Sequence, residues 1–243
     1  RIDEPTSEAT EIQTYAKDTE VTEAEKKANE DAKKAVSKVA LTSYAISNVA
    51  NKTNVMQQWG DAKCTNLSIP EGITYFQPTS EFGTKTLLQN YGYFNAVTTD
   101  KSHKDYIFEN NSSDNATSIY FEYTVTLNDV YKNKADFSDG TFYRYNKVIY
   151  SNIQDIINAY QDQKAIFDGK DAATVIAELK AAKDDTTDPE AKLDEFRKKY
   201  DIEVFNAGKT YYVQKIKDQY LGVDNTIQRN SIYLLNVKNI FNV

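Results

Sequence analysis

The sequence predicts a mainly β fold, α+β by count, with an antiparallel β-sandwich at its core. Its 243 residues include 18 tyrosines and 12% aromatic residues, which favour half-exposed strands because the ring packs while the hydroxyl stays hydrated. Apolar residues alternate with polar ones in several short segments. Helical spacing marks an insertion at residues 151–200 and an exposed helix near 22–38. Strands separated by turns, without β-α-β alternation, argue against a parallel nucleotide-binding sheet.

Charge and cysteine content exclude several classes of protein. The formal net charge is -7 and the chain contains no Lys/Arg run, so nucleic acid is not an expected partner. Cys64 is the only cysteine, which excludes a disulfide framework and a thiolate metal cluster, and we expect it to be a small half-buried residue. No stretch approaches the ~18 apolar residues that a transmembrane helix needs.

The chain opens on a short strand, which a polar region follows. Thr22 and Glu25 have capping-box spacing, and the turns after them carry only a narrow alanine stripe. The helix near 22–38 is therefore expected to stay exposed between strands. Val39–Val49 has strand character, and Val55–Trp59 is expected to continue it after a turn.

Residues 60–115 are expected to be irregular, because their short apolar pieces are broken by Pro, Gly and Asn-rich turns. Long loops on a rigid scaffold commonly carry binding sites. Aromatic residues are concentrated in this region, and some of them are candidate ligand contacts. These candidates are Tyr91, Tyr93, Phe94 and Tyr106.

His103, the only histidine, lies in the same region. A Ser-His-Asp arrangement can be drawn with Ser102 and Asp105, but these residues are neighbours on a polar loop and no nucleophile-elbow sequence accompanies them. We therefore expect His103 to be a solvated surface group. No catalytic residue, cofactor site or metal site is predicted, because the sequence has no Gly-rich phosphate loop, HExxH or CxxC motif and its carboxylates are scattered.

Ile119–Leu127 shows the clearest strand pattern of the chain. Its odd-numbered residues are apolar, and its even-numbered face, which includes Glu122, is expected to meet solvent or an inserted neighbour. A turn is expected at Asp136–Gly140. Thr141–Tyr150 is then predicted to be a second strand, rich in aromatic residues.

The insertion at 151–200 carries three apolar stripes at helical spacing, which we expect to pack against the sheet. Ser151 and Gln154 predict a capping box for the first helix. Asp188-Pro189-Glu190 has the order of an N-cap, an N1 proline and an acidic first turn, and it opens the last helix. The apolar face of that helix is formed by Leu193, Phe196 and Tyr200.

Strand character returns at Ile202–Phe205 and dominates the rest of the chain. Two apolar runs, Tyr211–Ile216 and Ile232–Ile240, flank a polar connection and are expected to form a closing pair of strands. In the second run, apolar residues occupy both faces of an extended chain. We therefore expect this run to be buried on both faces, in the centre of a sheet.

The C-terminal stretch also carries a recognisable motif. An aromatic-rich strand ends in a basic-acidic pair, and an Arg-Asn pair, a Tyr and alternating apolar residues follow. This motif resembles the C-terminal domain of the fimbrillins, the major and minor fimbrial subunits (type V pilins) of Bacteroidales. Arg1-Ile2-Asp3 and Val39–Trp59 resemble the segments that open the same domain, whereas the middle matches only in its pattern of strands. The motif residues are Lys217, Asp218, Arg229, Asn230, Tyr233, Leu235 and Val237.

The resemblance implies one transthyretin-like β-sandwich domain over residues 1–243, with the helical insertion, and the family's N-terminal domain is absent from this sequence. It implies a structural subunit of surface fimbriae that assembles by donor-strand exchange and supports cell adhesion. Other fimbrial subunits are the implied partners, with host or bacterial surface glycans and proteins as further ones. The implied location is the extracellular fimbrium, attached to the outer membrane through a lipoprotein precursor. Neither an enzymatic activity nor a cofactor is implied.

Two alternatives stay open. The domain could be a carbohydrate-binding tip or accessory adhesin module that does not itself polymerise, with the loop aromatics as its stacking surface. It could also be a hydrolase subdomain, although no residue of the sequence supports that function.

Overall fold

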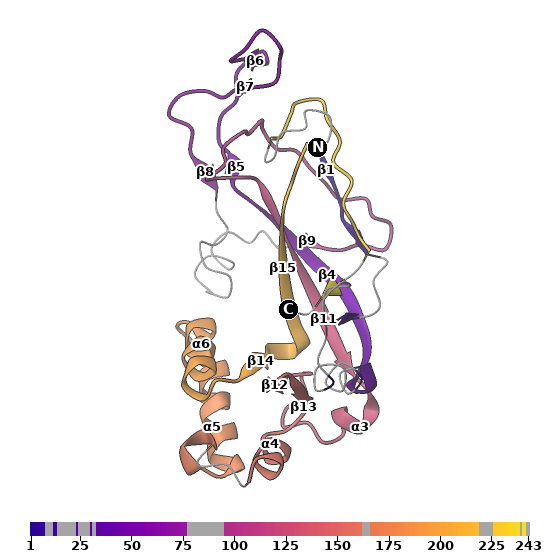
Figure 1. Ribbon diagram of the computed structural model, residues 1–243, viewed down its shortest axis with the longest axis vertical. Helices are drawn as coiled ribbons and strands as arrows, with labels where there is room; N and C mark the ends of the chain where they lie inside the picture. Colours follow the sequence, from indigo (N-terminus) through magenta and orange to yellow (C-terminus); the bar gives the residue numbers. More distant parts are fainter. Residues whose placement is uncertain are drawn as a thin grey trace.

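In the computed structural model, the described residues are 1–7, 12–13, 23, 30, 33–76, 95–161, 166–218, 226–238 and 240–241. The molecule is elongated, with long strands in its middle, short strand pairs at one end and a group of helices at the other (Figure 1). Most strand pairs in this part of the chain are antiparallel. The prediction of a mainly β fold is confirmed.

A four-stranded antiparallel sheet forms the centre of the molecule. Its strands are β4 (Val36–Ser47), β9 (Asn95–Ala96), β11 (Ser118–Leu127) and β15 (Lys209–Lys215), in the spatial order β15-β11-β4-β9. In β11 apolar and polar residues alternate, and all odd-numbered side chains from Ile119 to Leu127 are buried. The strands predicted at Val39–Val49, Ile119–Leu127 and Tyr211–Ile216 are thus confirmed, with small shifts of their ends.

The even-numbered face of β11 carries a buried carboxylate. Glu122 is only 8% exposed. Its carboxylate accepts hydrogen bonds from Ser43 Oγ at 2.8 Å, from Tyr211 OH at 3.0 Å and from Lys209 Nζ at 3.0 Å. Burial, together with the charge of Glu122, raises the pKa of Tyr211, so its hydroxyl remains a donor. Neighbouring strands, rather than solvent, therefore cover Glu122.

Strands near both ends of the sequence pack on the apolar side of this sheet. β1 (Ile2–Asp3) pairs antiparallel with β10 (Lys104–Asp105). β2 (Thr6–Ser7) and β3 (Ile12–Gln13) pair in parallel with β16 (Asn236–Val237) and β17 (Ile240–Phe241). Ile2 is fully buried in one apolar cluster with Tyr44 and Phe121 of the sheet. We call this cluster the main core.

Two short strand pairs lie at the end of the molecule away from the helices (Figure 1). β5 (Val49–Ala50) pairs with β8 (Tyr75–Phe76), and β6 (Gln58–Trp59) pairs with β7 (Leu67–Ser68). Only the last two residues of the predicted strand Val55–Trp59 are therefore in a strand. Trp59 is half-buried, and its strand partner is Leu67. The irregular character predicted for residues 60–115 is confirmed for their described part.

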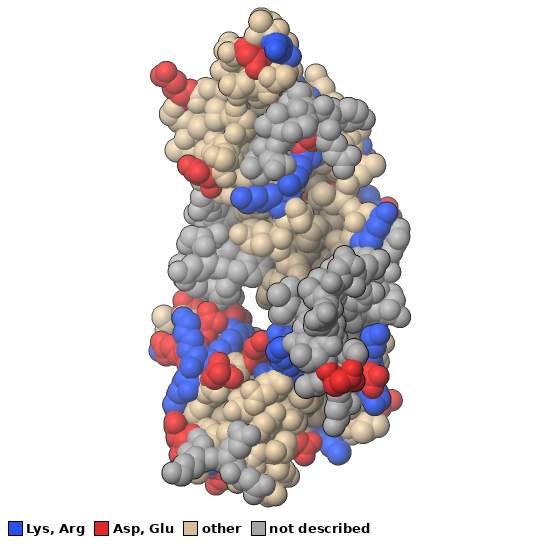
Figure 2. All heavy atoms as spheres, in the orientation of Figure 1, with Lys and Arg blue, Asp and Glu red and all other residues tan. Residues whose placement is uncertain are grey.

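A second apolar cluster, the helical core, lies at the other end. β12 (Phe142–Tyr145), β13 (Val148–Tyr150) and β14 (Glu203–Phe205) form a three-stranded antiparallel sheet there. The helices of this core are α4 (Ile153–Ala159), α5 (Ala172–Lys183) and α6 (Pro189–Tyr200), with 3₁₀ turns at Ile166–Gly169 and Asn206–Gly208. The short helix α3 (Asp129–Lys132) follows β11, and its Tyr131 packs on the main core. Side chains of both charge signs gather over α6 on the face that Figure 2 shows.

Side-chain caps explain where the helices of this region begin. Asn152 Oδ1 accepts from Asp155 N at 2.7 Å, so Asn152 caps α4 and the predicted cap Ser151 is wrong by one residue. Asp188 caps α6, with Pro189 in its first turn, as predicted. The apolar helix faces pack into the helical core, on the small sheet. The buried residues there include the predicted Leu193, Phe196 and Tyr200.

The predicted strand Thr141–Tyr150 is a hairpin. Asn146 and Lys147 connect β12 to β13, and both have a positive φ, 45° and 68°. Two consecutive left-handed residues form the type I′ turn whose twist matches a β-ribbon, and Asn is favoured there. In the sequence, Asn146 is the residue that indicates a turn. The aromatic strand pattern continues on both sides of it and predicts one long strand instead.

The predicted helix near 22–38 lies largely outside the described residues. Lys33, Lys34 and Ala35 are helical, and β4 begins at Val36, so any such helix ends earlier than predicted. Its N-terminal boundary and its alanine stripe stay predictions.

Gly208, which leads from the helical core into β15, offers a test of this junction. Its φ is 71°, and a Cβ on it would lie 2.5 Å from Val125 O. We expect Gly208→Ala to lower the free energy of unfolding by about 2–4 kcal/mol, because left-handed strain adds to a steric clash. Gly169→Ala is the control: its φ is 73° but nothing lies within 4 Å of its Cβ, so it should cost only about 1 kcal/mol. If urea denaturation shows the same loss of unfolding free energy for Gly208→Ala and Gly169→Ala, the clash with Val125 O is contradicted.

Candidate functional site

Residues 226–238 form an extended segment that runs beside β1 and β2 (Figure 1), and we call it the C-terminal segment. Tyr233 N donates to Arg1 O at 2.9 Å, and Asp3 N donates to Tyr233 O at 3.1 Å. Thr6 N donates to Leu235 O at 2.9 Å. The segment is therefore added as a parallel strand to the first residues of the chain. The predicted closing pair with β15 is wrong.

Side chains of the C-terminal segment alternate between the main core and solvent. Tyr233, Leu235 and Val237 are half-buried against the main core. Ile232 and Leu234 are 55% and 76% exposed, because they lie on the opposite face of the extended chain. The prediction that this run is buried on both faces is therefore wrong. The segment is a surface strand with one covered face.

Arg229 fixes the beginning of the segment. Its Nε and Nη2 donate to the two carboxylate oxygens of Glu109 at 3.0 and 2.7 Å. The remaining donors reach main-chain oxygens, with Nη1 at 2.9 Å from Val55 O and Nη2 at 2.7 Å from Asn54 O. The planar guanidinium suits such a two-pronged contact, which a lysine could not make. One side chain thus ties the C-terminal segment to two other parts of the chain.

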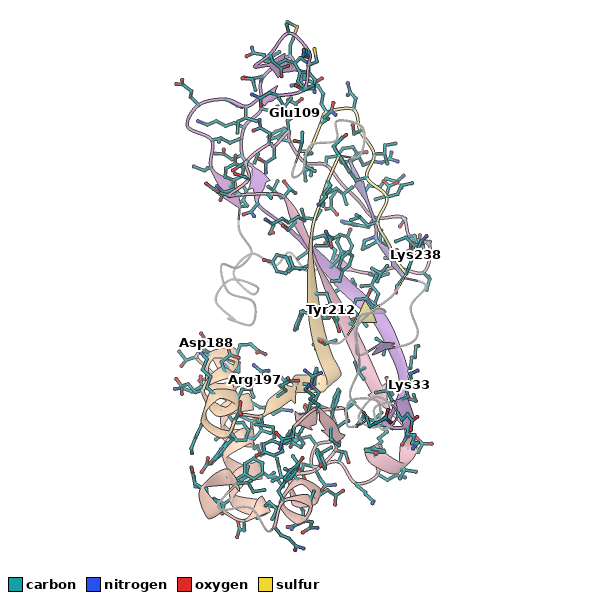
Figure 3. The ribbon with its side chains drawn as sticks, viewed as in Figure 1. Lys33, Glu109, Asp188, Arg197, Tyr212 and Lys238 are labelled. Atoms are coloured by element: carbon teal, nitrogen blue, oxygen red, sulfur yellow. The ribbon has the colours of Figure 1, made fainter. Side chains whose placement is uncertain are left out.

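Glu109, the partner of Arg229, is buried. It is 4% exposed and lies towards the end of the molecule that holds the short strand pairs (Figure 3). Burial tends to raise the pKa of its carboxyl, but hydrogen bonds from Arg229 and Thr53 and the charge of the guanidinium outweigh burial. The pKa of Glu109 therefore lies below its ordinary value, and the carboxylate stays ionised at neutral pH.

A second contact holds the middle of the segment. Tyr233 OH donates to Asp218 Oδ2 at 2.9 Å and accepts from Gln228 N at 2.9 Å. Asp218 is 4% exposed. Burial, followed by the hydrogen bond to Asp218, raises the pKa of Tyr233 to about 12. The tyrosine is therefore a neutral donor that links the segment to the residues directly after β15.

The motif residues thus fall into two groups. Asp218, Arg229 and Tyr233 hold the C-terminal segment through polar contacts, while Leu235 and Val237 pack on the main core. Lys217 and Asn230 are exposed, and Asn230 has a φ of 59°, a left-handed conformation that asparagine tolerates. The sequence pattern found the residues of the segment. It missed Glu109, because nothing in the local sequence marks a carboxylate as buried.

The candidate ligand aromatics are only partly described. Tyr106 follows β10 directly and is 78% exposed. Tyr91, Tyr93 and Phe94 lie outside the described residues. Tyr106 therefore stands alone as the structurally described member of this predicted group.

The structure does not assemble a Ser-His-Asp site at His103. His103 Nε2 lies 3.3 Å from Asp105 Oδ1, but Ser102 Oγ donates to Asp100 at 3.0 Å instead of contacting the imidazole. The His103 side chain is 42% exposed, which agrees with the predicted surface position. Its main chain exchanges two hydrogen bonds with Glu4.

Other candidate chemistry is limited in the described part of the chain. Among these residues, no group of three or more His, Cys, Asp or Glu side chains could hold a metal ion. Cys64 is exposed, so the expectation of a half-buried thiol is wrong. None of the described helices combines the length and the apolar character needed to cross a bilayer.

Comparisons with known proteins add no assignment. Neither a scan against protein-family models nor a search of curated proteins gives a match to this chain.

The Arg229–Glu109 pair leads to a first test. Arg229→Met should leave the Glu109 carboxylate buried without its cation, and an unsatisfied buried group costs about 1–3 kcal/mol. Arg229→Lys should recover only part of the loss, because it lacks the fork geometry. The control is Arg144→Met, which removes a two-pronged contact to Glu203, a residue whose side chain is 52% exposed. Exposed pairs contribute about 0.2–1 kcal/mol. In urea denaturation, Arg229→Met should lose the most unfolding free energy, Arg229→Lys less and Arg144→Met the least. A larger loss for Arg144→Met than for Arg229→Met would contradict this assignment.

The lowered pKa of Glu109 leads to a test with pH. Because the folded-state pKa is below the unfolded value of about 4.3, the stabilisation by this group is complete above that pH. It is lost as the pH falls through the folded-state pKa. In Arg229→Met, burial without the cation should instead raise the pKa of Glu109. The difference in unfolding free energy between wild type and Arg229→Met should therefore shrink between neutral pH and about pH 3. A difference that is the same at both pH values would contradict the assignment.

Proposed function

We propose that this chain is a structural subunit of surface fimbriae that assembles by donor-strand exchange and supports adhesion. One observation carries the proposal: the C-terminal segment is a surface strand whose alternate side chains enter the main core. Main-chain hydrogen bonds to β1 and β2 hold it, and they do not depend on side-chain identity. An extended segment bound in this way is the form of recognition that β-strand addition uses.

When two copies exchange this segment, nearly the same contacts form between the copies as within a single chain. A second copy presents the same backbone groups and the same Tyr233, Leu235 and Val237 side chains, so the bonds lost within one chain reform between two. The segment must first leave its own chain. Breaking the Arg229–Glu109 pair opposes that step, so we expect exchange to be slow at neutral pH and faster under mildly denaturing conditions.

The finer fold and family belong to the same proposal. We infer that the central sheet and the strands near the chain ends are the two layers of a transthyretin-like β-sandwich, since both contribute side chains to the main core. The fimbrillin resemblance supports this inference, because its motif residues Asp218, Arg229 and Tyr233 are the ones that hold the C-terminal segment. A location on the cell surface and the absence of enzymatic activity follow from the same resemblance.

Disulfide trapping tests the exchange directly. Thr6 and Asn236 are strand neighbours whose side-chain oxygens lie 3.1 Å apart. Thr6→Cys with Asn236→Cys, in a Cys64→Ser background, places a thiol pair across the exchangeable strands. If the reduced protein is incubated at high concentration in mild denaturant, well below its unfolding midpoint, and then oxidised, intermolecular disulfides should give a ladder on non-reducing gels. Protein oxidised before this incubation should stay monomeric by light scattering.

A matched pair in the central sheet is the control. Lys38 and Thr126 are exposed neighbours on β4 and β11, which are not expected to separate. Lys38→Cys with Thr126→Cys, in the same Cys64→Ser background, should give only intramolecular bonds after the same treatment. Monomers with intramolecular disulfides for both pairs would rule out exchange of the C-terminal segment.

A further inference from the structure

A pocket of about 260 Å³ lies where β4, β5, β8, β9 and β10 come together. Its described lining is mainly apolar, with Ile46, Val49, Phe76 and Ile107. Asn95, Asp105 and Tyr106 add polar groups. None of these residues belongs to the C-terminal segment. A function of this pocket is therefore independent of strand exchange.

Two aromatic rings at the pocket are incompletely covered by the protein. Phe76 is 48% exposed and Tyr106 is 78% exposed. Rings in this position can bury apolar area against a ligand at a small cost in side-chain entropy, because each has only two rotatable bonds. Their flat faces suit a ligand that itself has a flat apolar face.

The polar side of the pocket is held in place by a hydrogen-bond network. Tyr44 OH donates to Asp105 Oδ2 at 2.7 Å, and His103 Nε2 lies 3.3 Å from Asp105 Oδ1. Tyr44 is fully buried, and its hydroxyl also interacts with the Asn95 side chain. A carboxylate has about four lone-pair positions, so Asp105 can still accept further hydrogen bonds from a ligand. The amide of Asn95 supplies both a donor and an acceptor.

Charge and size narrow the class of ligand. The described lining residues include one carboxylate and no Lys or Arg. The Arg1 guanidinium interacts with the lining residue Tyr106, but it is already paired with the Asp3 carboxylate. This charge balance disfavours phosphate, sulfate and carboxylate ligands. Sites for drug-sized ligands have volumes of about 300–1,000 Å³, so this pocket suits something smaller. The Asp105 carboxylate is already engaged by Tyr44 and His103, so a hydroxyl donor suits it better than a full positive charge.

We propose that this pocket binds a single neutral pyranose ring of a saccharide. An apolar C–H face of the ring packs on Tyr106 or Phe76, and its hydroxyls donate to Asp105 and exchange hydrogen bonds with Asn95. The pocket thereby gives the chain a glycan-binding activity in addition to its proposed structural function.

Saturation-transfer NMR on the whole chain tests this assignment. The probes are the methyl glycosides of glucose, galactose, mannose, fucose and N-acetylglucosamine at millimolar concentration. At least one should receive saturation at its ring C–H protons. Tyr106→Ala and Phe76→Ala should each weaken its affinity by about tenfold, the effect of losing one aromatic contact of about 1.4 kcal/mol.

Two variants separate the pocket from a general aromatic effect. Phe108→Ala removes an aromatic side chain that is 46% exposed and outside the pocket lining, and it should leave affinity within about twofold of wild type. Tyr106→Phe keeps the ring and should also bind. Urea midpoints close to that of wild type would show that each variant is folded.

The outcomes that overturn the proposal are distinct. Absence of saturation transfer to every glycoside would overturn it. Binding that persists unchanged in both Tyr106→Ala and Phe76→Ala would place the sugar elsewhere. Stronger binding of sialic acid or of a quaternary ammonium ion than of every neutral glycoside would show that the pocket selects charge.

Discussion

Burial of one face of β11 is the constraint on which the rest of the structure depends. The odd-numbered side chains of this strand form an apolar row between β4 and β15, and a single sheet leaves such a row exposed to water. A second layer must cover it. The chain supplies much of that layer from its first residues and from the C-terminal segment, and Ile107, Phe142 and Ile149 add further side chains to the main core. The covering layer is made of short pieces, so its attachment rests on a few contacts. Side-chain bonds among these contacts are Arg229–Glu109 and Tyr233–Asp218 for the C-terminal segment, and Glu4–Thr98 for the first residues.

The helical core is a second cluster in which apolar side chains are buried. Its small sheet and three helices come from the sequence between β11 and β15. Tyr143 and Val204 of the small sheet pack in the helical core, whereas Phe142 and Ile149 belong to the main core, so the small sheet joins the two clusters. The polypeptide leaves the central sheet at one end of β11 and returns to it through Gly208. The backbone at Gly208 lies so close to Val125 O that this position has no space for a Cβ atom. The charged residues over α6 lie far along the molecule from Glu109 (Figure 3).

Sequence patterns predicted the elements whose signals are local. The alternation in β11 and the Asp188-Pro189 start of α6 depend on neighbouring residues alone, and both were found. The hairpin at Asn146 was missed because one turn residue competed with a continuous aromatic pattern. The pairing of β2 with β16 joins residues 230 positions apart, and no local pattern specifies such a partner.

The candidate sites show the same division. The motif pointed to Arg229 and Tyr233, but not to Glu109, because burial of a carboxylate is decided by the tertiary fold. Tyr106 is singled out by the sequence as a loop aromatic, whereas Phe76 and Asn95 join it at one pocket only in the folded chain. The sequence motif thus contains both Tyr233 and its partner Asp218, but of the Arg229–Glu109 pair it contains only Arg229.

The parallel pairing of β2 with β16 also has a consequence for symmetry. A segment that takes the place of β16 must run in the same direction as β2, so every replacement repeats one orientation of the donated strand in the acceptor groove. The surface that gives the segment differs from the surface that receives it. Contacts of this kind are heterologous, and repeated without closure they build an open filament. Such a filament is polar: at one end a subunit has an unfilled groove, and at the other a subunit has an unused strand.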